Sequence, residues 1–278
     1  MNNLVEMKPR TYGMEKNPFK WPLSVLFGFI IILVEITFTI KAYSLWPIEE
    51  SGAFTVFRNW HSDLGSSLSG YNSIEGAFYH NSGIIIQGFA IIMFCGGLSI
   101  SLRESFQNKY LFLICQIFGI LSGFALLMAG IYSLDLREDH KFWASCYFIC
   151  ILPFIGMLSY LLIHASGFKK WIGFYGFFVI LFDGIFALTF LSPIEIYILE
   201  YFVIGSIQLF ILLVAMSIFM TEVMIQALNT GIIKKDYASA ISDFYNRSSP
   251  FKTAVAPNDK LNSINIEIKT SNFINASL

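Results

Sequence analysis

Charged residues are scarce in this chain of 278 residues. Asp, Glu, Lys and Arg together make up 13% of it, about half of the roughly 25% that is usual in soluble domains. Hydrophobic residues make up 55% and the mean hydropathy is +0.63. This composition excludes an ordinary soluble domain and indicates a protein embedded in a membrane.

An excess of basic residues is also absent. The formal net charge is −1 and the sequence pI is about 6.4. Binding to a phosphate backbone requires a basic surface. We therefore exclude nucleic acid as a partner, and membrane lipids are the partners that the composition predicts.

Cysteine is rare and does not occur in the polar stretches. The four cysteines, Cys95, Cys115, Cys146 and Cys150, all lie in apolar segments rather than in exported loops, where an oxidising compartment would pair them. Cys146 and Cys150 are spaced for one face of a helix and could serve a metal, but buried apolar cysteine is the better interpretation.

Long apolar runs dominate the rest of the chain. A helix needs roughly 20 residues to cross the hydrocarbon core, and the runs lack the alternation of barrel strands. We expect an all-α protein, a single bundle of six transmembrane helices over 22–228, preceded by a cytoplasmic segment (1–21) and followed by a mostly disordered cytoplasmic tail (229–278). The predicted spans are 22–44, 79–101, 110–133, 142–165, 171–192 and 197–228.

The basic residues predict the orientation of the bundle. Of the 18 lysines and arginines, only Lys41, Arg58, Arg137 and Lys141 fall on one side of the predicted spans, and the other 14 fall on the opposite side. Basic residues are retained in the cytoplasm. We therefore expect a cell-membrane protein with both termini cytoplasmic, and the connectors 45–78 and 134–141 on the outer side.

Two acids, Glu35 and Asp183, lie within predicted spans at similar depth. An ionisable group in a membrane is costly and is a functional candidate by default. We expect the two to share a polar pocket, with Thr37, Gln87, Gln116 or Gln208 as hydrogen-bonding partners. Two interpretations stay open: the acids join helices, or they form part of a proton or cation path.

The outer connectors and the helix starts beside them carry most of the remaining candidate chemistry, and three of the four histidines lie there. Histidine with carboxylates can bind zinc with one position open for water, or supply a general base. The spacing matches no HExxH, GxSxG, HxxxH or CxxC motif, so catalytic residues, metal and cofactors stay unassigned, and turns and helix caps are the alternative interpretation. The candidate outer-face site comprises Arg58, His61, Asp63, Asn72, Asn81, Asp135, Asp139 and His140.

Two of these stretches carry a resemblance to a known family. The run "HSDLGSSLSGYNSIEGAFYHNSGIIIQG" (61–88) resembles the motif "ISDLG…N…FN.G…G" of the membrane family called domain of unknown function 998, which is similar in layout to the FRAG/DRAM/Sfk group of six-helix proteins. The run "AGIYSLDLREDHKFWASCYF" (129–148) is similar to that family's second motif. Here His61 replaces an apolar residue and Ser133 a proline. The resemblance implies six helices and an outer-face site, and no established reaction.

Three functions of different class follow from these observations. The first is binding of a lipid head group or small polar ligand at the outer His/Asp site, with Arg58, Trp60 and Tyr71 as candidate contacts. The second is a metal-dependent hydrolase or transferase acting on lipids. The third is a proton- or cation-coupled transporter. For the site itself, we expect the two connectors to pack together and to pair Asp63 with His140.

Overall fold

The computed structural model describes residues 22–102, 106, 108–165, 168–190 and 196–229. Over these residues all regular secondary structure is helical, without strands, which confirms the predicted all-α class. The terminal segments expected at 1–21 and beyond Asn229 lie outside the described residues. The elements are α1 (Leu23–Ser44), α2 (Ile48–Ser51), the 3-10 helix η2 (His61–Gly65), α3 (Ile74–Leu102), α4 (Lys109–Ile131), α5 (Arg137–His164), α6 (Lys170–Phe190) and α7 (Tyr197–Asn229).

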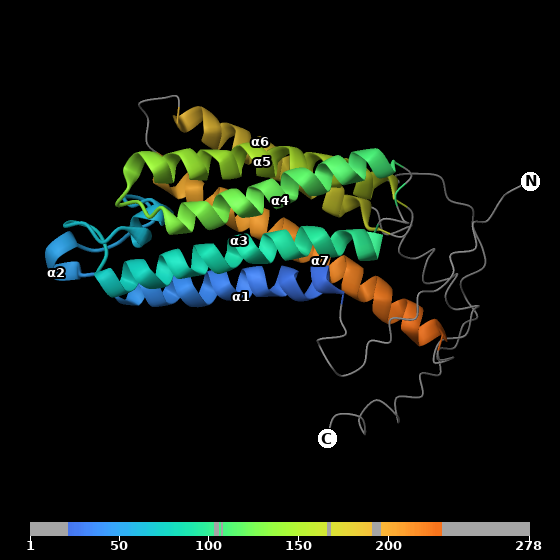
Figure 1. The fold of residues 1–278 in the computed structure, drawn as a ribbon, viewed down its shortest axis with the longest axis horizontal. Coiled ribbons are helices and arrows are strands. Elements are labelled where there is room, and N and C mark those ends of the chain that lie inside the picture. Colours follow the sequence, from blue (N-terminus) through green and yellow to red (C-terminus); the bar gives the residue numbers. More distant parts are fainter. Residues whose placement is uncertain (1–21, 103–105, 107, 166–167, 191–195, 230–278) are drawn as a thin grey trace, which may run out of the picture.

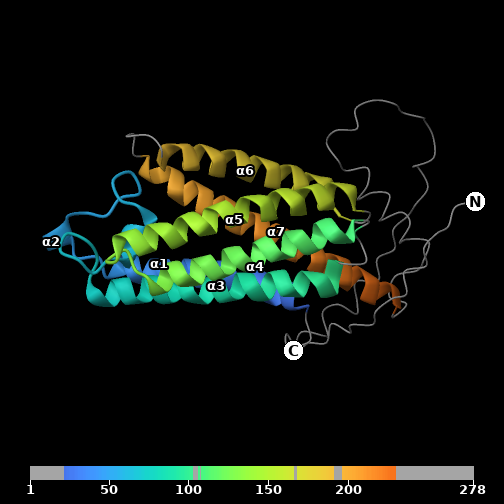
Figure 2. The same ribbon diagram turned by 45° about the horizontal axis from the view of Figure 1, so that its top comes forward.

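Six of these helices are long and apolar enough to cross a membrane, namely α1 and α3 to α7. They form one elongated bundle in which α1 packs on α3, α3 on α4, α4 on α5, α5 on α6 and α6 on α7, and α7 returns to α1 (Figure 1). The view turned by 45° shows the same lengthwise packing (Figure 2). The chain is therefore a multi-pass membrane protein whose neighbours in sequence are mostly neighbours in space.

Close packing between α3 and α4 depends on glycine. A side chain at Gly88 would meet the backbone of Gly123 and Leu127, and one at Gly130 would meet the backbone oxygen of Asn81. Without Cβ atoms the two helix backbones approach closely, as they commonly do in membranes. Large side chains such as Phe94, Phe154 and Phe210 fill the interior and are fully buried.

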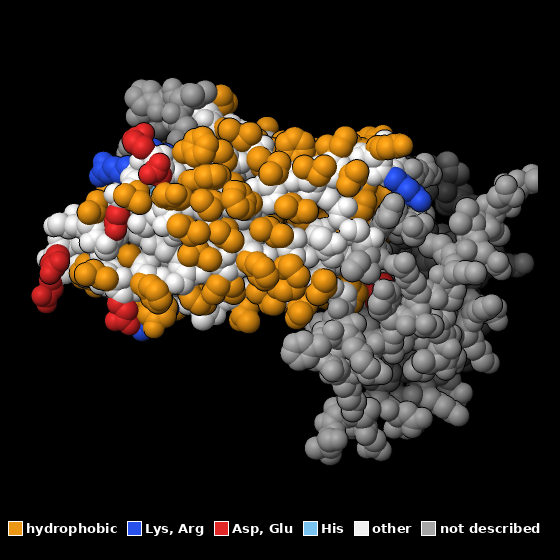
Figure 3. Space-filling model, viewed as in Figure 1, with side chains coloured by type: hydrophobic (Ala, Val, Ile, Leu, Met, Phe, Trp, Pro, Cys, Tyr) orange, Lys and Arg blue, Asp and Glu red, His pale blue; other side chains and the backbone are white. Residues whose placement is uncertain are grey.

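The surface divides into an apolar flank and a polar end. Hydrophobic side chains cover the length of the bundle, whereas most of the acidic side chains in view gather at the end that carries α2 (Figure 3). Leu33 and Leu181 on the flank are 65% and 60% exposed, which suits contact with lipid tails. We refer to the polar end as the η2 end, because η2 lies over the helices there.

Two helices begin earlier than the hydropathy predicts. The structure starts α3 at Ile74 rather than at 79, and α5 at Arg137 rather than at 142. The first turns contain Glu75 in α3 and Glu138 and Asp139 in α5. Acids are favourable at the positive end of a helix but lower the local hydropathy, so an apolar window misses such turns. His140, which was expected in the connector, consequently lies inside a helix.

Candidate functional site

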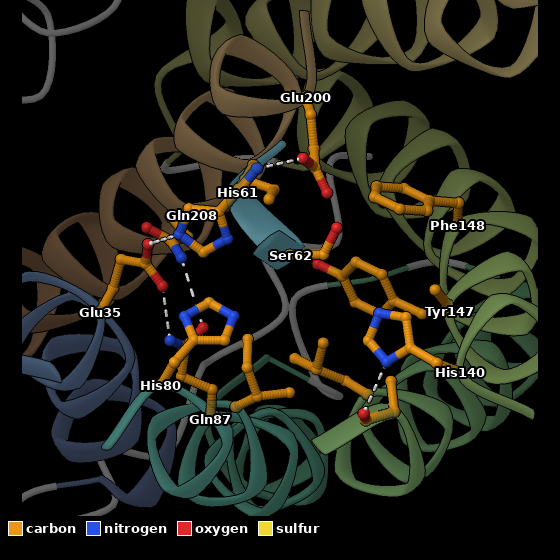
Figure 4. Close-up of a pocket in the computed structure, with 15 residues that line it drawn as sticks. Glu35, His61, Ser62, His80, Gln87, His140, Tyr147, Phe148, Glu200 and Gln208 are labelled. Carbon is orange, nitrogen blue, oxygen red and sulfur yellow. Dashed lines mark hydrogen bonds and ion pairs between the residues drawn. The ribbon is translucent and has the colours of Figure 1, made fainter. Parts of the chain in front are cut away.

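A cavity of about 60 Å³ lies inside the bundle near the η2 end. About 15 Å³ accommodates one water in this measure, so the cavity has room for a few small groups. Five of the six spanning helices and η2 contribute to its wall, and α6 does not. The lining residues are Glu35 of α1; His61 and Ser62 of η2; His80, Ile84 and Gln87 of α3; Leu126 and Ala129 of α4; His140, Ala144, Tyr147 and Phe148 of α5; and Glu200, Ile204 and Gln208 of α7 (Figure 4).

A buried ion pair between His61 and Glu35 forms one wall of this cavity. The imidazole Nε2 of His61 lies 3.0 Å from Oε1 of Glu35, and the two side chains are 5% and 15% exposed. Burial alone would lower the pKa of His61, but the carboxylate of Glu35 outweighs it, so that the pKa of His61 is raised above its ordinary 6.5. The pair therefore places opposite charges beside the cavity.

Glu35 also accepts hydrogen bonds from two side chains other than His61. The amide Nε2 of Gln87 donates to Oε2 of Glu35 over 2.6 Å, and the hydroxyl of Thr39 donates to Oε1 over 3.1 Å. Gln208 donates in turn to the amide oxygen of Gln87 over 3.3 Å. A chain of polar contacts thus runs from α7 through α3 and α1 to η2, and it confirms Gln87 as the predicted partner of Glu35.

Glu200 holds η2 in place over the cavity. The backbone N–H of His61 donates to its carboxylate, and the N–H of Ser62 interacts with the same group. The first amides of a helical turn have no partner within the turn, so a carboxylate at this position satisfies them. Asp63 caps the same turn from inside the connector, where its Oδ2 accepts from the N–H of Trp60 over 2.9 Å.

The other two histidines of the η2 end also reach the cavity. The ring of His80 lies edge-on to that of His61, with centroids 4.9 Å apart. The Nδ1 of His140 lies 3.0 Å from the carbonyl oxygen of Ala129 and 2.9 Å from that of Tyr132. Carbonyl oxygens only accept, so Nδ1 of His140 carries a proton, and Nε2 is the acceptor of the neutral ring.

The two outer connectors pack together as predicted, and Asp135 joins them. Its Oδ1 accepts from the hydroxyl of Ser66 over 2.7 Å and from the N–H of Ser67 over 2.9 Å, and its Oδ2 accepts from the hydroxyl of Ser67 over 2.6 Å. Burial would raise the pKa of Asp135, but the hydrogen bonds from Ser67 and Ser66 outweigh it and lower the pKa. The carboxylate therefore fastens the loop after η2 to the start of α5.

The predicted pair of Asp63 and His140 is wrong. Asp63 faces the start of η2, where it accepts from Trp60, and its charge acts on Glu200 and Tyr201. His140 bonds through Nδ1 to carbonyl oxygens at the end of α4 instead. The early start of α5 accounts for the difference, because it holds His140 within the first helical turn, where its ring reaches the preceding connector.

The remaining outer-face candidates do not line the cavity. Asn72 donates to the carbonyl oxygens of Ala42 and Leu64, and Asn81 donates to that of Gly65 over 2.9 Å, so both hold the connector in place. Arg58 and Asp139 are exposed at the surface. Of the eight predicted residues, His61 and His140 reach the cavity.

Asp183 does not share the pocket of Glu35, contrary to the prediction. It is fully buried in α6, and neither carboxylate oxygen has a hydrogen-bond partner among the described residues. Similar depth does not bring two residues together, because the direction in which each side chain leaves its helix also matters. Asp183 instead comes close enough to Tyr147 of α5 for their electrostatic interaction to matter.

The polar lining residues that belong neither to the predicted outer site nor to the predicted intramembrane polar pocket are Ser62, His80, Tyr147 and Glu200. Glu200 is an acid near the outer end of the last apolar run, the same signal that identified Glu35. In the part of the chain that the structure describes, no three His, Cys, Asp or Glu side chains are grouped to hold a metal ion. The histidines and carboxylates of the described residues therefore do not form the zinc site that was one of the open possibilities.

Comparisons with models of known protein families, with curated proteins and with solved structures find no match to this chain.

Proposed function

We propose that this multi-pass membrane protein binds a small polar ligand, such as the hydroxyl- or amine-bearing part of a lipid head group, in the cavity at the η2 end. The observation that carries the proposal is the convergence of His61, Glu35 and Gln87 on one cavity within an otherwise apolar bundle. Ionisable groups are expensive in a membrane and concentrate at functional sites. A bundle held together by packing alone has no need of them.

The lining favours a ligand that both donates and accepts hydrogen bonds. Carboxylates of Glu35 and Glu200 accept, while the amide groups of Gln87 and Gln208 can do either. A hydroxyl or ammonium group suits such a wall. Phosphate suits it less, because Arg58 is exposed and is not part of the lining.

The distribution of basic residues along the sequence supports the predicted orientation. Of the 18 lysines and arginines, the η2 end carries Lys41, Arg58, Arg137 and Lys141, and the other 14 fall on the opposite side of the spans, among them Lys109, Lys169 and Lys170 at the starts of α4 and α6. Basic residues mark the cytoplasmic side. In the proposed orientation the protein spans the cell membrane with both termini in the cytoplasm, and the cavity lies close to the outer surface.

A second candidate is a hydrolase or transferase that works without a metal. His61 beside Glu35 has the arrangement of a general base and the acid that orients it. Such an enzyme would act on an ester or amide of a lipid whose polar part enters the cavity. Release of fatty acid from lipid vesicles by the purified protein, lost in His61→Gln, would support this candidate over simple binding.

Ligand-induced stabilisation tests the binding proposal. Purified full-length protein is unfolded thermally with glycerol, ethanolamine, choline or myo-inositol as probes, since a ligand that binds the folded state raises the Tm with concentration. We expect at least one probe to stabilise the wild type. Gln87→Leu should remove that effect because Gln87 lines the cavity.

A matched control exists on the neighbouring helix. Gln116 of α4 is buried like Gln87, but it bonds to the carbonyl oxygen of Cys95 and to Ser99 and does not line the cavity. Gln116→Leu should therefore keep the probe effect. Equal stabilisation of Gln87→Leu and wild type, or no stabilisation by any of the four probes, would contradict the proposal.

A further inference from the structure

Asp183 is a buried acid that the proposed ligand site does not use. It lies in α6 with 0% exposure, and both of its carboxylate oxygens are without a hydrogen-bond partner in the described part of the chain. An unpaired charge at such a position would cost far more than the bundle can recover elsewhere. The group is therefore neutral in this arrangement, which for a carboxyl means that it carries a proton.

A metal cation would be a poor alternative occupant. Hard cations such as Ca²⁺ take six to eight oxygen ligands, whereas the described residues around Asp183 supply no second acid and form no cluster able to hold a metal. A proton needs the carboxylate alone. The chemistry of the position therefore selects a proton.

Tyr147 of α5 lies near this acid and also lines the cavity. Asp183 and Glu35 are both close enough to its hydroxyl for their charges to act on it. Figure 4 shows the ring of Tyr147 directed into the cavity. Tyr147 is therefore near two acids, one in the polar network of the cavity and one without a hydrogen-bond partner in the described part of the chain.

Two titratable groups at the start of the adjacent helix α7 have hydrogen-bond partners elsewhere. On α7, Glu200 accepts from the backbone of His61, and the hydroxyl of Tyr201 donates to the carbonyl oxygen of Asn59. Beside Asp183 on α6, Phe182 packs on Phe202 of α7. Tyr147 is consequently the side chain best placed to connect Asp183 with the cavity.

We propose that Asp183 is an intramembrane proton-binding site that exchanges its proton with the cavity by way of Tyr147. In the exchange, the Asp183 acid gives its proton to the tyrosine oxygen while the tyrosine hydroxyl proton passes to a water in the cavity. The reverse transfers then bring a proton from the cavity back to Asp183, so that both side chains end neutral. A bridging water or a rotation of the Tyr147 ring completes the path. The site does not depend on ligand binding in the cavity.

Infrared spectroscopy of the purified full-length protein tests this proposal, because a protonated carboxyl has a C=O stretching band apart from the amide bands. We expect the wild type at neutral pH to show a band that is lost in Asp183→Asn and retained in Glu222→Gln, which removes another acid of a spanning helix. Asp183→Glu should restore a band at a shifted position. On transfer to heavy water, the carboxyl proton of Asp183 exchanges for deuterium and the band shifts. We expect this shift to be slower in Tyr147→Phe than in the wild type.

Each alternative outcome overturns a defined part of the proposal. A wild-type spectrum without the band, or a band equally strong in Asp183→Asn, would show that Asp183 carries no proton. If Asp183→Asn does not fold, titration of the wild-type band with pH and its shift in Asp183→Glu decide the assignment. Unchanged exchange in Tyr147→Phe would reject the tyrosine path.

Discussion

The imidazole of His61, in a connector between two membrane helices, lies 3.0 Å from the carboxylate of Glu35, more than two turns inside α1. The ring thus extends from the polar end of the bundle into the membrane-spanning part. Glu200 fastens the backbone of the same histidine. One residue therefore connects η2 to both α1 and α7, and places a charge beside the cavity.

Breaking the pair should destabilise the bundle. We expect Glu35→Gln and His61→Leu each to lower the free energy of unfolding by about 3–5 kcal/mol, because the surviving partner is left buried and unpaired. The double variant should lose clearly less than the sum of the two. Unfolding titrations in detergent give the three values, and Glu75→Gln, an exposed acid of α3, serves as the control. Additive losses would show that the two side chains are not coupled.

Stability should depend on pH through His61. Its folded-state pKa is raised above the ordinary 6.5, so the stabilisation is fully present below that pH and is lost as the pH rises through the folded-state pKa. We expect the wild type to lose stability above about pH 6.5, and Glu35→Gln to lose less over the same range. A wild-type profile that is flat there, or that rises, would contradict the assigned pair.

Asp135 should keep the loop after η2 in place. Asp135→Ala leaves the N–H of Ser67 and two hydroxyls without their acceptor, so we expect a loss of roughly 1–3 kcal/mol and faster amide hydrogen exchange at 66–70. Asp139→Ala, at an exposed position nearby, should change little. The pKa of Asp135 is lowered in the folded state. Its contribution to the free energy of unfolding is therefore present at neutral pH and is lost as the pH falls through the folded-state pKa. Equal amide hydrogen exchange at 66–70 in Asp135→Ala and Asp139→Ala would contradict this role of Asp135.

The orientation of the bundle is testable by labelling. Ser69 is exposed in the loop after η2, and Lys169 is exposed at the start of α6. We expect Ser69→Cys to react with an impermeant thiol reagent on intact cells, and Lys169→Cys to react only after the membrane is opened. The native cysteines give the background, measured in wild type. The reverse pattern would place the η2 end in the cytoplasm.

The six spans were predictable because crossing a membrane requires a long apolar run, whatever the tertiary structure. The first predicted span, 22–44, differs from α1 by a single residue. Errors concentrated where polar residues begin a helix, as at Glu75 and Glu138, because hydropathy cannot distinguish a polar first turn from a connector.

The candidate site was harder to predict from the sequence than the six spans were. Glu35 and Gln87 were recognisable as polar groups within apolar runs, whereas the contact of His61 with Glu35 spans 26 residues and depends on how the connector folds back into the bundle. The depth of a residue along a membrane helix can be counted from the sequence. The neighbouring helix that its side chain faces depends on how the helices pack, which the count does not give. For that reason Asp183 was predicted beside Glu35. The resemblance to domain of unknown function 998 stays a prediction.

Native mass spectrometry of the full-length protein, released from membranes in mild detergent, shows directly whether the cavity at the η2 end holds a polar ligand group. We expect wild type and Gln116→Leu to retain a bound lipid or small polar molecule of defined mass, and Gln87→Leu to lose it while remaining folded. Retention of the same molecule by Gln87→Leu, or a wild type that carries nothing and gains nothing from added glycerol, ethanolamine, choline or myo-inositol, would contradict the proposal.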